Sequence, residues 1–232
     1  MHIHKNELFN SLTHLAGCIG GVLMTVVFFV LSIDVDAFLA VAVSVTGISY
    51  IILYASSFMH HANKLDEAGE SIWLKLDHCA IFFMMAGSYV GPMYIFAQGG
   101  ILWGVLAAVW LFAFFGMAVK LRYVVTPNWL NVVIYAPLCL AALVPMYLLW
   151  DSVDVIPENA VPITLMKAML VAGLLLYGIG GIIYALKRPD PKPGLIGFHG
   201  IFHLFVLAGS ALHAAALYYS IRAYPVIREL LL

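Results

Sequence analysis

Two histidine motifs and one carboxylate in this sequence have the residue types and spacing of a metal site. His199 and His203 are four residues apart, which puts both imidazoles on one face of a helix, one turn apart. Ser56 and His60 have the same spacing, and Asp77 follows in the next apolar stretch. Two histidines from one helix, one from another and a nearby carboxylate form the nitrogen and oxygen set typical of zinc.

A zinc ion held by three protein ligands keeps a fourth position open for water, which is a catalytic rather than a structural arrangement. Zinc lowers the pKa of its water to about 7 and polarises carbonyl groups, so hydrolysis of an amide or ester becomes feasible at neutral pH. Asp77 would orient that water or take its proton. Ser56 would hydrogen-bond the water or a bound carbonyl, or orient a ligand.

The composition indicates which kind of element must carry these residues. Of the 232 residues, 64% are apolar and 10% are charged, whereas about a quarter are charged in an ordinary soluble domain. A soluble globular protein is therefore excluded.

The formal net charge of -1 provides no basic surface, so no nucleic-acid partner is expected. The three cysteines show no CxxC pairing, so neither a disulfide framework nor a thiolate metal site is indicated.

Charge-free stretches divide the chain into seven transmembrane helices, because a bilayer core of about 30 Å needs about 20 apolar helical residues. The stretch 79–119 is long enough for two helices, and Gln98-Gly99-Gly100 marks a turn inside it. Apolar runs without alternation favour a helix bundle over a barrel. We expect a single all-α membrane domain over residues 1–232, with spans at about 15–33, 37–60, 77–97, 100–119, 125–150, 166–186 and 196–220.

Prolines and glycines indicate how these helices bend and pack. Pro137 and Pro145 should kink the fifth span, and the carbonyls that they free must be satisfied by neighbouring helices or water. Glycines four residues apart allow close helix approach, with ordinary packing as the plainer interpretation. Such pairs are Gly17 and Gly21, Gly87 and Gly91, and Gly100 and Gly104.

The basic residues predict the orientation of the bundle. The N-terminal tail and the loops after the second, fourth and sixth spans carry Lys5, Lys64, Lys75, Lys120, Arg122, Lys187, Arg188 and Lys192. The opposite side carries only Lys167, Arg222 and Arg228. The positive-inside rule then puts the N-terminus in the cytoplasm and the C-terminus outside. This orientation brings all three candidate motifs to the cytoplasmic leaflet.

Each candidate residue also has a plainer interpretation. An HxxxH pair fits an interhelical hydrogen bond as well as a metal site, and only the convergence of three motifs favours the metal. Ser56 could bond to its own helix. His61 and His78 flank the motifs and would point elsewhere, as interfacial residues. His213 lies deep in the seventh span, where a polar packing contact is expected.

Several ordered motifs resemble those of the bacterial haemolysin III family, which belongs with the adiponectin and progestin receptors and, more remotely, with the alkaline ceramidases. The motifs are Glu7-x-x-Asn10-x-x-Thr13-His14, Ser56-x-x-x-His60, Leu76-Asp77-His78, Ala86-Gly87-Ser88-Tyr89 and Gly197-Phe198-His199-x-x-x-His203, preceded by Tyr184 to Pro189. The resemblance covers about Glu7 to Tyr219. The sequence departs from the family's Ala-Gly-Thr-Tyr-Thr-Pro pattern, because Gly91 intervenes before Pro92. This difference affects the expected local shape of the third span.

The resemblance implies a zinc ion near the cytoplasmic face, with three histidine ligands, an aspartate that holds the water and a serine beside it. By position in this chain, these are His60, His199 and His203 as ligands, Asp77 and Ser56. The N-terminal motif should lie near the same cytoplasmic mouth, either as an outer shell of the site or as caps of the helix end. Its residues are Glu7, Asn10 and His14.

Three functions follow from these observations. The first is a zinc-dependent hydrolase of a lipid amide or ester, which the ceramidase activity of the eukaryotic relatives suggests. The second is a non-enzymatic sensor or regulator of lipid state or membrane energetics, with a structural zinc. The third, a pore-forming haemolysin, ranks lowest because spans without a polar stripe offer little to line a pore. The expected partners are membrane lipids, including a lipid amide or fatty acid as ligand.

Overall fold

The computed structural model describes residues 7–63, 72–152 and 162–231, and almost all of these residues are helical. In chain order the helices are α1 (Leu8–Ile33), α2 (Ala37–Ala62), α3 (Ile72–Ser88), α4 (Val90–Phe96), α5 (Gly99–Arg122), α6 (Asn128–Ala141), α7 (Leu143–Ser152), α8 (Ile163–Leu186) and α9 (Phe198–Leu231). α3 with α4, and α6 with α7, each form one span, so the described residues contain seven helices of membrane length. The predicted seven-helix membrane bundle is confirmed.

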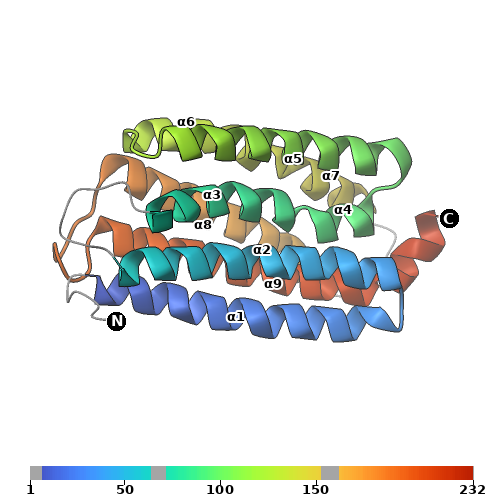
Figure 1. Cartoon of the computed structure of the whole chain (residues 1–232). Coiled ribbons are helices and arrows are strands. Elements are labelled where there is room, and N and C mark those ends of the chain that lie inside the picture. The colour runs from blue at the N-terminus through green and yellow to red at the C-terminus, as the bar shows by residue number, and fades with distance from the viewer. Residues whose placement is uncertain (1–6, 64–71, 153–161, 232) are drawn as a thin grey trace.

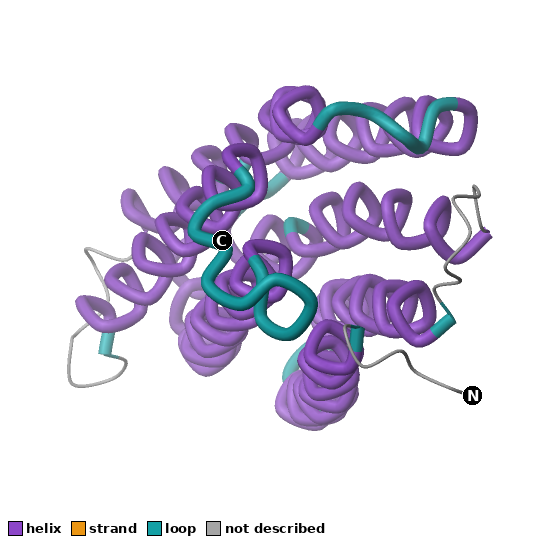
Figure 2. Tube along the Cα trace, turned by 90° about the vertical axis from the view of Figure 1, so that its left-hand side faces the viewer, coloured by secondary structure: helices purple, strands orange, loops and turns teal. Residues whose placement is uncertain are grey.

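The spans run alternately up and down, so distant parts of the sequence share each end of the bundle. Figure 1 shows one end, on the left, where α1 and α9 begin and α2 ends. Figure 2 views the molecule from that side, with the loop between α8 and α9 in teal. The motifs that carry histidines lie on these helix ends, so the predicted convergence follows from the topology.

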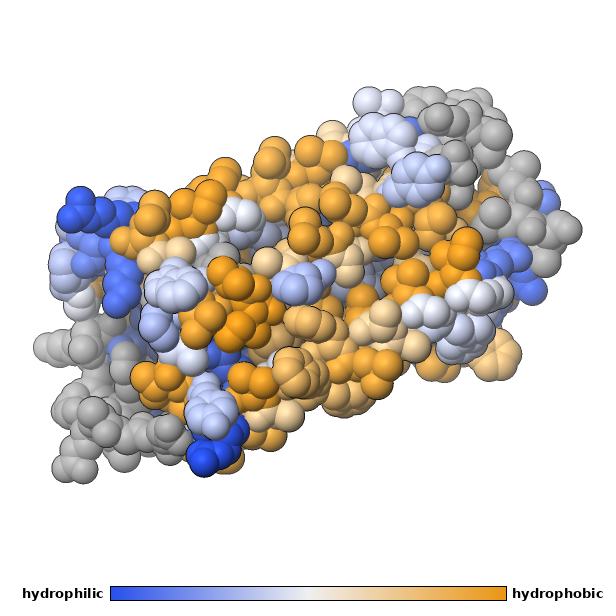
Figure 3. Space-filling view, turned by 90° about the horizontal axis from the view of Figure 1, so that it is seen from above, coloured by the Kyte–Doolittle hydropathy of each residue, from blue (hydrophilic) through white to orange (hydrophobic). Residues whose placement is uncertain are grey.

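The outer surface of the bundle is apolar over most of its length. Large side chains such as Leu111, Phe115 and Val30 are at least 62% exposed. Figure 3 shows an orange apolar band between hydrophilic ends. An apolar surface of this extent is stable only against lipid, which agrees with a protein that spans the membrane several times.

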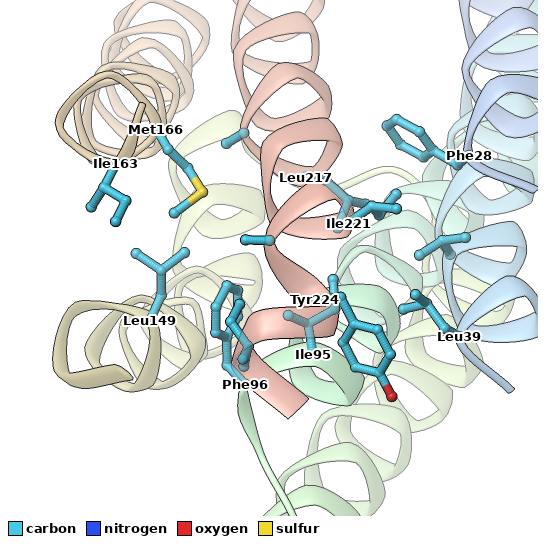
Figure 4. Close-up of a cluster of buried hydrophobic side chains, with 14 residues drawn as sticks. Phe28, Leu39, Ile95, Phe96, Leu149, Ile163, Met166, Leu217, Ile221 and Tyr224 are labelled. Carbon is cyan, nitrogen blue, oxygen red and sulfur yellow. The ribbon is translucent and has the colours of Figure 1, made fainter. Parts of the chain in front are cut away.

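The end of the bundle away from the histidines is closed by a packed apolar core. Figure 4 shows side chains from six helices that meet there. Those labelled are Phe28, Leu39, Ile95, Phe96, Leu149, Ile163, Met166, Leu217, Ile221 and Tyr224. This core packs α8 and α9 together with α1 and α2 at the end opposite the histidines.

The third span is interrupted where the sequence departs from the family pattern. Pro92 has no N–H to donate to its own helix, and α3 ends at Ser88. The Thr46 hydroxyl donates to the Gly87 carbonyl (2.9 Å) and accepts from the Gly91 N–H (3.0 Å). A hydroxyl from α2 is therefore inserted into the backbone ladder of this span, which accounts for its break.

The fifth span is interrupted before Pro145, as expected. α6 ends at Ala141 and α7 begins at Leu143, because proline cannot donate the next helical hydrogen bond. The Tyr89 hydroxyl donates to the Leu138 carbonyl just before the break. A neighbouring helix thus satisfies a carbonyl at the break, as a membrane interior requires.

The turn predicted at Gln98-Gly99-Gly100 is confirmed. α4 ends at Phe96 and α5 begins at Gly99. Gly99 has a φ of 53°, a left-handed conformation that glycine adopts without steric cost.

Candidate metal centre

Three histidines from two helices lie together at the end of the bundle where α1 and α9 begin. One ligand nitrogen each of His61, His199 and His203 lies within 4.8 Å of the other two. The ring centroid of His203 is 4.6 Å from that of His199 and 4.9 Å from that of His61. His61 and His203 are 3% and 1% exposed, and His199 is half-buried. Three imidazoles at these separations are ligands that zinc prefers.

The group contains His61 where the sequence analysis expected His60. The two side chains differ by about 100° around α2, because a helix turns once every 3.6 residues. His61 continues a buried stripe that runs along α2 through Tyr50, Tyr54 and Ser57. The expectation that His61 points away to the interface is therefore wrong, since its side chain faces the interior of the bundle.

His60 lies beside this group, with a different set of neighbours. One ligand atom each of His60, His61 and Asp77 lies within 4.8 Å of the others. His60 and Asp77 are both half-buried. The structure thus brings Asp77 to the two histidines at the end of α2, and His61 belongs to both groups.

The serine on the same helix face as His61 is Ser57, one position after the predicted Ser56. Ser56 lies four residues before His60 and is half-buried, whereas Ser57 lies four residues before His61 and is 2% exposed. Ser57 is therefore the hydroxyl on the same face of α2 as His61.

One span carries a polar stripe, contrary to the expectation that no span has one, and the inward-facing histidine belongs to it. Thr46, Tyr50, Ser57 and His61 follow one another at helical spacing, and all four are buried. Polar side chains inside a membrane face the protein interior because lipid cannot solvate them. Ser49, Ser56 and His60 follow one another at the same spacings, however, so the sequence alone does not distinguish His61 from His60.

The N-terminal motif reaches the same site, as expected. Glu7 and His14 are 6% and 5% exposed. The His14 ring stacks on His203 with a centroid distance of 3.7 Å, and Glu7 lies 2.7 Å from Nδ1 of His61. Asn10 donates to Glu7 over 3.0 Å. The start of α1 is thus part of the site.

The remaining two histidines of the described spans have other partners. His78 Nδ1 lies 2.9 Å from the Leu74 carbonyl of its own helix. His213 Nε2 lies 3.2 Å from the Leu170 carbonyl. The packing contact expected for His213 is confirmed.

The donor atoms fit a metal ion of the zinc type. His61 Nε2 is buried and has no hydrogen-bond partner among the described residues, while Nδ1 of the same ring contacts Glu7. A buried nitrogen without a partner costs free energy unless something else binds it. A cation among the three histidines would supply that partner.

A small cavity lies farther along the bundle. It has a volume of about 80 Å³, below the roughly 300–1,000 Å³ of usual small-molecule pockets. Its described lining comes mainly from α2, α4, α7, α8 and α9, and includes none of the three grouped histidines or Asp77.

Tyr54 and Tyr177 both hydrogen-bond Ser210 (2.6 and 2.8 Å). This hydroxyl cluster lies between α2, α8 and α9.

The chain is similar to known proteins over most of its length. A family model described as "Haemolysin-III related" matches residues 2–214. A Bacillus cereus protein named Hemolysin-3 is 30% identical over 212 residues, which cover 90% of this chain and 88% of the relative. A Hemolysin-3 homolog of Bacillus subtilis strain 168 is 27% identical over 216 residues, covering 89% of this chain and 90% of the relative. The grouped histidines lie inside the matched range.

Proposed function

Because the chain belongs to the haemolysin III family, we propose that this integral, multi-pass membrane protein binds one zinc ion and hydrolyses an amide or ester bond of a membrane lipid. The bond would lie at the cytoplasmic leaflet of the bacterial inner membrane. The observation that carries the proposal is the buried group of His61, His199 and His203 beside Asp77.

The proposed ligands differ from the sequence-based set at one position. His199 and His203 remain, and His61 takes the place of His60, because its nitrogen lies within 4.8 Å of theirs.

The chemistry would be divided between the metal and the residues around it. When bound, zinc supplies a Lewis acid that polarises a carbonyl and makes water more acidic. Asp77 is a carboxylate within 4.8 Å of a His61 ligand atom, so it would take a proton from the attacking water and return it to the leaving group. Ser57 would take the role first expected of Ser56, a hydrogen bond to the reacting carbonyl.

Access from the end of the bundle supports a catalytic role. His199 and Asp77 are half-buried, whereas His61 and His203 are buried. A lipid in the cytoplasmic leaflet could therefore present its polar group to the exposed side of the site while its hydrocarbon chains stay in the membrane.

The test combines metal analysis with lipid hydrolysis on detergent-purified protein. Wild type and Asp77→Asn should each contain about one zinc per chain, and only wild type should hydrolyse ceramides or other lipid amides or esters. His203→Ala should lose both metal and activity, and His78→Gln, a histidine outside the group, should keep both. Zinc retained in His203→Ala would overturn the ligand assignment, and unchanged hydrolysis by Asp77→Asn would overturn the role of Asp77.

A second candidate function is a non-enzymatic sensor or regulator in which zinc holds the helix ends together. The position of the small cavity favours it, because none of the grouped histidines lines that space. In this case wild type would bind zinc tightly without hydrolysing any lipid in the panel, and zinc removal would lower the unfolding temperature.

A further inference from the structure

The first two turns of α1 carry a polar motif that the chemistry above does not use. Glu7, Asn10 and Thr13 follow one another at intervals of three residues, so they lie along one side of the helix. That side contacts α2 through His61 and α9 through His203. The motif therefore reaches two of the three proposed ligands from a third helix.

Glu7 determines which nitrogen of His61 carries the proton. Its Oε2 lies 2.7 Å from His61 Nδ1, and both side chains are at least nine-tenths buried. A carboxylate only accepts hydrogen bonds, so Nδ1 must carry the hydrogen. Nε2 then holds the lone pair, and this is the atom without a partner among the described residues. Asn10 donates to the same Oε2 (3.0 Å) and holds the carboxylate in place.

Thr13 has the corresponding effect on His203. Its hydroxyl lies 3.0 Å from the Phe9 carbonyl and 2.9 Å from the Asn10 carbonyl, to which it donates. Because a hydroxyl has one hydrogen and these shorter contacts use it, Thr13 Oγ1 accepts from His203 Nδ1, which lies 3.4 Å away. The backbone of Asn10 is a second hydrogen-bond partner of the His203 ring. Nε2 of His203 is again left with the lone pair.

We propose that Glu7 and Thr13 are positioning residues of the metal centre, which hold His61 and His203 in the tautomer and orientation that bind a metal through Nε2. This inference rests on the proposed zinc site. A ligating histidine commonly donates its second N–H to a carboxylate or other acceptor, which fixes the ring and raises its basicity. Here both acceptors belong to α1, so metal binding also ties α1 to α2 and α9.

The test measures metal affinity rather than activity. Zinc affinity by competition with a chromophoric chelator, and the visible absorption of the cobalt-loaded protein, are compared for wild type, Glu7→Gln and Thr13→Val. Thr25→Val is the matched control, because Thr25 is also on α1 and its hydroxyl also bonds to its own helix (Gly21 carbonyl, 2.7 Å). Thr13→Ser restores the acceptor and serves as the rescue.

We expect Glu7→Gln and Thr13→Val to weaken zinc binding about 10- to 100-fold, the usual effect of losing such an acceptor, and to shift the cobalt absorption bands. Thr25→Val and Thr13→Ser should match wild type. If wild type binds zinc and both variants bind it equally well, or if only the unfolding temperature of the metal-free protein falls, the positioning role is overturned and the metal site stands. If wild type binds neither zinc nor cobalt, the proposed function itself fails.

Discussion

Two adjacent histidines at the end of α2 differ in what surrounds them, and this decides their expected roles. His61 is 3% exposed and grouped with His199 and His203, whereas His60 is half-buried and grouped with Asp77. A ligand must direct its lone pair at the ion, so one residue of rotation on a helix decides which side chain can bind.

We therefore expect His61→Ala to lose stoichiometric zinc and His60→Ala to keep it. Elemental analysis of the two purified variants beside wild type measures this directly, and each variant is the other's control for the loss of one imidazole. Zinc lost in His60→Ala and kept in His61→Ala would restore the ligand set expected from the sequence.

Much of the candidate site could be predicted from residue spacing alone. His199 and His203 share a helix face because they are four residues apart, and Asp77 meets His61, the third member of the group, because its span begins at the same end of the bundle. The choice between His60 and His61 depends on the rotation of α2 about its axis. Packing against neighbouring helices fixes that rotation, and the HxxxH and SxxxH spacings do not contain it.

At the level of helix pairs, glycines allow close approach at some of the predicted positions and not at others. A methyl group on Gly87 would lie 2.4 Å from Ser49 Cβ, and one on Gly17 would lie 2.6 Å from the Tyr54 ring. Gly100 and Gly104 have no neighbour within 4 Å of such a methyl group among the described residues. The close approach that the glycine spacing allows therefore occurs at Gly17 and Gly87, and it does not occur among the described residues at Gly100 and Gly104.

We expect Gly87→Ala to destabilise the protein by about 1–3 kcal/mol, because the added methyl group must push α3 away from α2. Gly104→Ala is the matched control, and it should leave stability unchanged or raise it slightly through helix propensity. Thermal unfolding in detergent compares the two. Equal effects of both substitutions would show that the α2–α3 contact is not tightly packed.

The loop between α1 and α2 is joined to α4 and α9 by one carboxylate. Asp36 accepts hydrogen bonds from the Tyr224 hydroxyl (2.9 Å) and from Arg228 Nη1 (3.0 Å). It also accepts from the Tyr94 hydroxyl (3.2 Å) and from the backbone N–H groups at the start of α2. Burial alone would raise the pKa of Asp36, but the hydrogen bonds from the two tyrosine hydroxyls and the two backbone N–H groups outweigh it and hold the pKa below its ordinary value.

This junction should make stability depend on pH. Because the folded-state pKa of Asp36 lies below the unfolded value of about 3.9, its ionised form stabilises the fold above that pH. The contribution is lost as the pH falls through the folded-state pKa. We expect Asp36→Asn to cost about 1–3 kcal/mol at pH 7, as for hydrogen bonds to a charged group, and the difference from wild type to shrink below about pH 4.

Unfolding temperatures at neutral and acidic pH measure this difference. Asp34→Asn is the control, because Asp34 is exposed and lies two residues away in the same loop. A loss of stability that is the same at both pH values, or the same in both variants, would contradict the role of the Asp36 carboxylate.

For the whole molecule, the number of spans could be predicted from the length of the apolar runs, since backbone hydrogen bonding in lipid leaves few alternatives to a helix. The breaks were only partly predictable. Pro145 indicates the break between α6 and α7, whereas the break between α3 and α4 also depends on Thr46, a residue more than forty positions away that donates to Gly87. A hydrogen bond from one helix to the backbone of another forms only between neighbouring spans, and the length of the apolar runs does not show which spans are neighbours.

The orientation of the bundle in the membrane determines which leaflet the metal centre faces. In the described residues, the end of the bundle that carries the histidines also carries Lys75, Lys120, Arg122, Lys187, Arg188 and Lys192. Lys5 and Lys64 of the predicted set lie outside the described residues. The opposite end carries Lys167, Arg222 and Arg228. The positive-inside rule then predicts that the histidines face the cytoplasm and the C-terminus lies outside.

We expect alkaline phosphatase fused after Leu232 to be active in a bacterial host, and green fluorescent protein at the same position to stay dark, because phosphatase matures outside the cytoplasm and the fluorescent protein inside it. The same reporters fused after Arg122, at the end of α5, should show the reverse pattern. A fluorescent C-terminal fusion with an inactive phosphatase would place the three histidines at the outer leaflet. The proposed substrate would then be a lipid of that leaflet, because the three histidines lie at that end of the bundle.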